Sequence, residues 1–311
     1  MMHDGDRMII GSPSFASVSA LPAPRWSGYA KAFLATLLWG CSFIAIRFAL
    51  ASATPYGLVW LRNALAVVLL FGLLWLRGGP LLPERADRGR VVALGLIFGV
   101  HLLSQAYAMQ FTSSMHAGWI IAFIPAVVAV GAWLFQRQRL RVIGWFGIAV
   151  ATAGVLLLTG TSLTHFTVAG LGDLIMLGTT FTWAGYTLIT VGPARRNGGL
   201  RIAASALAIS LLPALAMAAV FGTWAAPPTA GSILAIVFLG AGASALAMWT
   251  YSDAVAELGA ERSASFQYVQ PLITMAAAAL LLAEPLTPEL YIGGPVVLAG
   301  VWLVQRGKKG L

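Results

Sequence analysis

The sequence predicts an all-α membrane protein of ten transmembrane helices, arranged as two inverted five-helix repeats around a central cavity. Three observations predict this fold: a very apolar composition, ten apolar segments of membrane-spanning length, and basic residues that flank those segments on one side only. Apolar residues occupy 59% of the 311 positions and charged residues only 9%, against about 25% charged residues in a soluble domain. Such a chain cannot form a charged exterior, so lipid is its expected solvent.

The ten expected spans are the apolar runs long enough to cross about 30 Å of hydrocarbon, which takes roughly 20 residues per helix. Before the first run, residues 1–27 are rich in proline and serine and lack the layout of a cleaved signal peptide. We therefore expect a disordered cytoplasmic tail followed by an uncleaved first helix. The spans are expected at residues 29–50, 56–76, 90–110, 115–135, 142–159, 171–191, 202–222, 231–252, 263–283 and 289–305.

The basic residues orient these spans, because Lys and Arg resist translocation and collect in cytoplasmic loops. With ten spans and the N-terminus inside, all 19 basic residues except Arg47 and Arg62 fall in inside segments. Adding or deleting one span would scramble this pattern, so both termini are expected in the cytoplasm. The net charge is +9, but the basic residues lie along one side of the membrane and form no contiguous stripe. Nucleic acid is therefore excluded as a partner.

The two halves, residues 28–160 and 161–311, are related by an internal repeat. In the first helix of each half, the segment TLLWG that contains Trp39 matches the segment TFTWA that contains Trp183, 144 residues later. Because five helices is an odd number, the second half crosses the membrane in the opposite direction. Inverted repeats are typical of transporters, whose sites lie near the midplane between the halves. The other matched pairs are Tyr107 with Tyr251 at 144 residues, and Pro125 with Pro271, Gly147 with Gly293 and Gly154 with Gly300 at 146 residues.

Several of these residues carry a resemblance to a known family. Trp39-Gly40 in the first helix, Pro125 in the fourth, and Pro271, Glu284-Pro285, Gly293 and Gly300 in the second half resemble the EamA-type branch of the drug/metabolite transporter superfamily. Within that branch, the chain looks most like the aromatic amino-acid exporters. The resemblance implies a ten-helix basket and export of small metabolites, commonly amino acids. One departure is Gln138, which stands where the first repeat usually has an acidic residue.

Polar and aromatic residues inside the spans are the candidates for substrate binding, because a polar group that faces lipid is costly. The ninth span has the longest polar stripe, from Ser263 to Thr274 at helical spacing. The alternative is that Ser and Thr bond to their own helix and that Tyr anchors at the interface. His101 is expected either to relay a proton and bind a carboxylate or to pack as a neutral side chain. The candidates are Trp39, His101, Gln105, Tyr107, Trp183, Tyr186, Trp249, Tyr251, Gln267 and Gln270.

Two arginines and two prolines inside the spans are candidates for gating. Arg47 and Arg62 each cost about 2.5 to 3.5 kcal/mol at the midplane. Both are expected either to snorkel to the headgroups, which relieves much of that cost, or to serve in gating or in attracting a carboxylate. Arg47 shares a helix face with Trp39 and is the gating candidate of the two. Pro125 and Pro271 each remove a helix hydrogen bond near mid-span and are expected as hinges, or as passive kinks.

Several classes of function are excluded by missing chemistry. The chain has no metalloprotease or hydrolase motif and no carboxylate dyad at the midplane, so no catalytic residue and no cofactor are expected. Cys41 is the only cysteine, which leaves no disulfide framework and no thiolate metal site. With no carboxylate at the midplane, uncoupled facilitation is favoured, and a proton-coupled exporter that uses His101 is the alternative.

The expected function is therefore export of amino acids, aromatic or otherwise neutral, by alternating access through a bacterial inner membrane. We expect a monomer in lipid, with a small molecule as its partner. A sugar-phosphate or nucleotide-sugar exchanger is the second alternative, and it should place several Lys or Arg in the central cavity. Lys and Arg are not expected there in this chain, so a mostly uncharged cavity is predicted.

Overall fold

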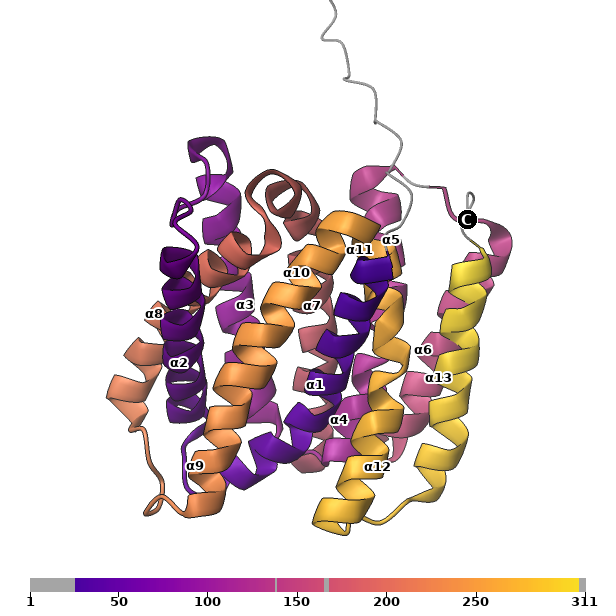
Figure 1. The fold of residues 1–311 in the computed structure, drawn as a ribbon. Helices are drawn as coiled ribbons and strands as arrows, with labels where there is room; N and C mark the ends of the chain where they lie inside the picture. Colours follow the sequence, from indigo (N-terminus) through magenta and orange to yellow (C-terminus); the bar gives the residue numbers. More distant parts are fainter. Residues whose placement is uncertain (1–25, 138, 165–167, 308–311) are drawn as a thin grey trace, which may run out of the picture.

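The computed structural model describes residues 26–137, 139–164 and 168–307, and within these ranges it is a bundle of helices (Figure 1). An isolated bridge pairs Ala53 with Trp224. Most of the expected tail lies outside the described residues, as does Gln138. The helices are α1 (Trp26–Leu50), α2 (Pro55–Leu76), η1 (Arg85–Asp87), α3 (Arg88–Ala108), α4 (Ser114–Ile121), α5 (Ile124–Gln136), α6 (Val142–Thr164), α7 (Val168–Asn197), α8 (Gly199–Phe221), α9 (Ala230–Val237), η2 (Phe238–Leu246), α10 (Ala247–Leu258), α11 (Ala260–Ser265), η3 (Phe266–Tyr268), α12 (Gln270–Leu282) and α13 (Pro288–Arg306).

Eight helical stretches in the described part of the chain are long and apolar enough to cross a membrane, and this makes the protein a multi-pass membrane protein. Each of the ten expected spans coincides with one helix or with a run of consecutive helices. Two of the ten expected spans, α6 and α13, are not among these eight stretches. The apolar part of α6 is shorter than the others. The number of ten spans therefore stays a prediction.

The bundle has two chemically different ends. One end, which we call the basic face, contains the start of α1 and the ends of α2, α5, α7 and α10, and lies at the top of Figure 1. The other end, which we call the opposite face, contains the end of α1 and the starts of α2, α7 and α9. Helices α1, α3, α7, α10 and α12 pass between them and surround the middle of the bundle.

The fourth helix of each half is interrupted at the same place. In the first half, α4 ends at Ile121 and α5 begins at Ile124; in the second half, η3 lies between α11 and α12. Pro125 and Pro271 occupy the first turn of α5 and α12, where a missing N–H costs no helix hydrogen bond. Each expected kink therefore lies at an interruption of the fourth helix, where Phe123 and Val269 keep right-handed helical dihedral angles. The role of the two prolines as hinges stays a prediction.

A second irregularity lies in the stretch from α9 to α10, where η2 is a π-helical segment of nine residues. Such segments are rare and often occur at functional sites. Gly240 in η2 packs against α2, because a Cβ atom there would lie 3.0 Å from the backbone oxygen of Arg62. The π-helical segment thus brings the backbone of the eighth expected span close to the second.

The fifth helices of the two halves, α6 and α13, pack against each other through glycines. A Cβ atom on Gly147 would lie 2.5 Å from the carbonyl oxygen of Gly300, and one on Gly154 would lie 3.0 Å from that of Gly293. The order of these pairs makes the two helices antiparallel. Since Gly147 matches Gly293 and Gly154 matches Gly300 in the repeat, equivalent helices meet here in opposite directions.

Candidate functional site

A small cavity of about 40 Å³ lies in the middle of the bundle, between the two halves. Ligand sites typically have about 300 to 1,000 Å³, so this cavity has to widen before it can hold an amino acid. Six of the ten candidate binding residues line this cavity, and the other lining residues add one buried arginine and several apolar side chains. The lining residues are Trp39, Ser42, Arg62, Phe98, His101, Leu102, Gln105, Ile121, Ile124, Trp183, Ala243, Gln267 and Gln270.

The equivalent tryptophans of the two halves meet at the cavity. The ring centroids of Trp39 and Trp183 are 4.8 Å apart and the rings are nearly perpendicular, at 85°, which is a favoured geometry for aromatic pairs. The indole nitrogen of Trp39 donates a 2.9 Å hydrogen bond to the carbonyl oxygen of Ala243 in η2. In the described structure the indole nitrogen of Trp183 makes no hydrogen bond of good geometry, although Trp183 lies next to the hydroxyl group of Tyr251.

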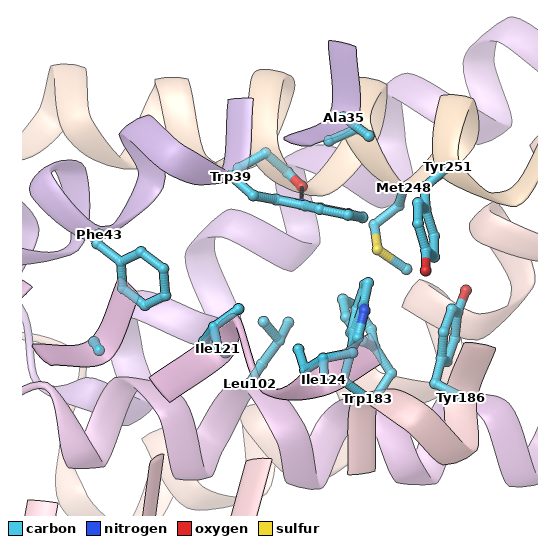
Figure 2. Packing of buried hydrophobic residues seen from close by; sticks show 14 of the residues in the cluster. Ala35, Trp39, Phe43, Leu102, Ile121, Ile124, Trp183, Tyr186, Met248 and Tyr251 are labelled. Carbon is cyan, nitrogen blue, oxygen red and sulfur yellow. Dashed lines mark hydrogen bonds between the residues drawn. The ribbon is translucent and has the colours of Figure 1, made fainter. Parts of the chain in front are cut away.

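Tyr186 and Tyr251 lie next to these indoles, on the side toward the basic face, with their hydroxyl groups pointing toward each other (Figure 2). Both side chains are fully buried, and neither lines the cavity. Tyr251 packs 5.0 Å from Trp39 and 5.4 Å from Trp183, and its hydroxyl group lies 3.2 Å from that of Thr187. These two candidate binding residues therefore lie between the cavity and the basic face and do not line the cavity.

His101 connects α3 of the first half with α7 of the second. Its Nδ1 atom lies 3.2 Å from the carbonyl oxygen of Thr179 and 3.1 Å from the hydroxyl of Thr182. A carbonyl oxygen can only accept, so we assign the proton to Nδ1, which leaves Nε2 as an acceptor. The ring also stacks on Phe98, with 13° between the planes, and lies 5.1 Å from Trp183.

The cavity has one apolar wall and one polar wall, and these walls are related by the repeat. Ile121 and Ile124 of the first half lie 146 residues before Gln267 and Gln270 of the second, and all four side chains line the cavity. Figure 2 shows both isoleucines close to Leu102, below the ring of Trp39. The side-chain oxygen of Gln267 is buried and has no hydrogen-bond partner in the described structure. Equivalent positions therefore supply apolar contact from one half and free polar atoms from the other.

Arg62 is the one basic residue among the lining residues, a position that the sequence does not predict. Its side chain is only 4% exposed, and Nε donates a 2.8 Å hydrogen bond to the hydroxyl oxygen of Ser244 in η2. Snorkelling of Arg62 to the headgroups is therefore wrong, and so is the expectation of no Lys or Arg in the central cavity. Its place well inside α2, next to the buried polar residue Asn63, was the signal in the sequence.

Two of the candidate binding residues lie outside the cavity. Tyr107 is 36% exposed and packs against Phe111. Trp249 lies under the guanidinium group of Arg77, 4.8 Å from the ring centroid, and lines a separate groove on the side of α2 and η2. Both expectations are corrected for the same reason: neighbouring polar residues of one helix spread over a wide arc, and only one face can point inward.

Arg47 also points away from the cavity. Its guanidinium group donates to the carbonyl oxygen of Thr112, whose hydroxyl group donates to Asp173. His116 lies 3.3 Å from the carboxylate of the same Asp173. These contacts join the end of α1, the segment before α4 and the start of α7 at the opposite face. A role of Arg47 in gating stays a prediction, but direct contact with a ligand in the cavity is excluded in this conformation.

Carboxylates in the described part of the chain lie at the two ends of the bundle, and none lines the cavity. At the opposite face, Glu284 accepts hydrogen bonds from the backbone nitrogens of Ser114 and Met115 at the start of α4. At the basic face, Lys31 forms ion pairs with Asp253 at 3.3 Å and Glu257 at 2.6 Å. Among the described residues, no group of His, Cys, Asp and Glu is arranged to hold a metal ion.

Comparison with known proteins agrees with this arrangement. The EamA-like transporter family matches the chain twice, over residues 26–160 and 170–306. The resemblance inferred from Trp39-Gly40, Pro125 and their counterparts is thereby confirmed. A solved crystal structure with 19% sequence identity has the same fold, with a TM-score of 0.69 over 92% of this chain and 99% of the other.

Three similar proteins are named as transporters, exporters or efflux pumps. A protein of Streptantibioticus cattleyicolor, named "Probable terminal-alkyne amino-acid exporter", is 27% identical over 89% of this chain and 93% of its own. A protein of Escherichia coli, named "Probable amino-acid metabolite efflux pump", is 24% identical over 88% of this chain and 92% of its own. An uncharacterized transporter of Archaeoglobus fulgidus is 25% identical over 88% and 96%.

Proposed function

Since the chain belongs to the EamA-like transporter family, we propose that it exports small neutral amino acids, aromatic ones among them, across a bacterial inner membrane. The protein is a membrane transporter and not an enzyme. Two of its relatives are named for amino acids or their metabolites, at 27% and 24% identity. The substrate class proposed for this chain rests mainly on its own cavity.

The observation that carries the proposal is the unlike chemistry of the two cavity walls. An amino acid has an apolar or aromatic side chain at one end and charged, hydrogen-bonding groups at the other. Ile121, Ile124 and the two indoles offer the first end apolar contact and a stacking surface. Gln267 and His101 offer acceptors, and Trp183 offers a donor, to the second end. The cavity therefore suits a molecule with both kinds of surface.

We further propose that ten spans in two inverted repeats carry the substrate by alternating access, with both termini in the cytoplasm. The antiparallel pairing of the matched glycines in α6 and α13 supports the inverted relation. The interrupted fourth helices, next to Pro125 and Pro271, are the proposed hinges. Tyr186 and Tyr251 close the cavity toward the basic face, so this conformation is shut on the side that we assign to the cytoplasm.

Uncoupled facilitation is the proposed mode of transport. A coupling cation needs a carboxylate or another ionisable group near the midplane, and the cavity lining includes no Asp or Glu in the described structure. His101 is the remaining candidate for proton coupling. Its ring is held by contacts with α7, which suits a positioning role between the halves better than movement with a proton.

The test is amino-acid flux in liposomes that contain the purified protein. We expect labelled L-phenylalanine and L-leucine to exchange across the membrane with and without a pH gradient, at similar rates. Trp183→Leu removes the indole in the cavity and should lower phenylalanine flux at least about tenfold, on the scale of a lost buried aromatic contact. Trp249→Leu makes the same change outside the cavity and should leave the flux within about twofold.

Absence of flux for every amino acid in correctly folded wild-type protein would contradict the proposed function. Flux that depends strictly on the proton gradient would overturn the uncoupled mode and keep the substrate class. Equal losses from Trp183→Leu and Trp249→Leu would show that the cavity is not the substrate site.

A further inference from the structure

We propose that Arg62 and Ser244 form the site that binds the carboxylate of the substrate, and that this pair makes the protein selective for acids over the matching amides and amines. This inference rests on the proposed function and adds to it the orientation of the substrate and the chemical group that is recognised.

The geometry of Arg62 leaves its binding surface free. In the described part of the chain the guanidinium group makes one hydrogen bond, from Nε to the hydroxyl oxygen of Ser244. No described carboxylate forms an ion pair with it, although other arginines of the protein, such as Arg196 with Asp87, do have such a partner. Among the described residues, neither terminal nitrogen of Arg62 has an acceptor. These two nitrogens are the ones that bind a carboxylate through two parallel hydrogen bonds.

The burial of Arg62 indicates that its positive charge has a function. A buried cation without a partner costs several kcal/mol even after relaxation, and buried charges in proteins are normally paired. Arg62 is 4% exposed and is held in the middle of a membrane bundle. Arg47, which is only half-buried near the end of α1, has its guanidinium group bonded to the carbonyl oxygen of Thr112. Arg62 lacks such a structural partner, so its partner is expected to be the ligand.

The π-helical segment η2 explains why Arg62 stays in the cavity. Ala243 and Ser244 are adjacent residues of η2; Ala243 accepts the hydrogen bond from Trp39, and Ser244 accepts the one from Arg62. Gly240 lets the backbone of η2 approach α2 at Arg62 itself. One short segment therefore holds both the indole and the guanidinium group in position.

The remaining lining residues give the substrate an orientation. With the carboxylate on Arg62, the ammonium group finds acceptors in the unpartnered oxygen of Gln267 and in Nε2 of His101. The side chain then lies against Ile121, Ile124 and the indoles. In the second half, the residue that matches Arg62 at an offset of 144 is Ala206, so the site exists once and fixes one orientation.

The experiment compares acids with their amides in the purified, full-length protein. Binding is measured by competition with labelled L-phenylalanine, using unlabelled L-phenylalanine, L-leucine and the amide of each. In the wild type, each amide should bind about 10- to 100-fold more weakly than its acid, because it lacks a charge-assisted, two-pronged contact. In Arg62→Gln, the acid should weaken to within about threefold of the amide, and Arg62→Lys should fall between the two.

Two further measurements separate a binding role from a structural one. Arg47→Gln removes the other arginine inside a span and should leave the ratio of acid to amide affinity unchanged. Arg62→Gln should melt in detergent no lower than the wild type, since it removes a buried charge without a partner.

The outcomes distinguish this inference from the proposed function. If the wild type binds acids and amides equally well, or if Arg62→Gln keeps the wild-type ratio, the inference is overturned and amino-acid transport stands. If neither amino acid binds or crosses the membrane, the proposed function fails with it. If labelled glucose 6-phosphate binds the wild type and the amino acids do not, Arg62 serves a phosphate, and the exchanger alternative replaces both.

Discussion

The α6–α13 contact and the central cavity are both built from equivalent positions of the two halves. At the contact the equivalent residues are of the same type, whereas at several positions of the cavity they differ in chemistry. At the α6–α13 contact each half contributes the same residue type, so glycine meets glycine twice. In the cavity the tryptophans match, but Ile121 is opposite in chemistry to its equivalent, Gln267. Backbones in direct contact leave room only for glycine, whereas a binding site gains orientation from unlike walls. The repeat is symmetric in packing and asymmetric in chemistry.

The largest expected effect comes from breaking the symmetric contact. A Cβ atom on Gly300 would lie 2.2 Å from the backbone nitrogen of Ala151, so Gly300→Leu forces α6 and α13 apart. We expect loss of most folded protein, measured as monodisperse yield in detergent and as melting temperature. Gly178→Leu is the matched control, because nothing lies within 4 Å of a Cβ atom there. Similar yields for both variants would mean that the contact does not hold the halves together.

A smaller effect is expected when the asymmetry of the cavity is removed. Gln267→Ile makes this position identical to Ile121 and takes away an unpartnered buried oxygen. The protein should stay as stable as the wild type or gain about 1 to 3 kcal/mol, the cost of an unsatisfied buried polar group. The half-saturating concentration of phenylalanine should rise about tenfold in the liposome assay. A variant with normal transport would show that the polar wall is not used by the substrate.

The smallest expected effect is a difference in stability between variants of Trp39 and Trp183. Trp39→Phe removes the hydrogen bond from the indole to Ala243, while Trp183→Phe removes a nitrogen that makes no hydrogen bond of good geometry in the described structure. Trp39→Phe should therefore be less stable than Trp183→Phe by about 1 kcal/mol, the net worth of one hydrogen bond. Thermal melting of the two variants in the same detergent measures this difference. Equal melting temperatures would mean that the two halves are equivalent here as well.

Much of the fold could be predicted from the chain alone. Apolar runs, the position of Trp39 and Trp183, and the spacing of the glycines in α6 and α13 depend on local composition and on periodicity, and the helices begin and end close to the expected residues. Less of the site could be predicted. The sequence predicts Tyr107 and Trp249 as lining residues and leaves open whether Arg62 reaches the headgroups or faces the interior. Periodicity gives the angle between residues of one helix but not the direction in which that helix faces.

The sequence by itself determined that the protein lies in a membrane, where its helices run, and that its halves repeat, because these properties follow from the cost of exposing polar groups to lipid and from matched segments of the chain. Only the tertiary structure decided that Arg62 meets Ser244 across 182 positions, that Ile121 and Gln267 line one cavity, and that Arg47 is bonded at a helix end. These contacts depend on the rotation of each helix about its axis. That rotation is set by packing among all the helices together, which no single segment encodes.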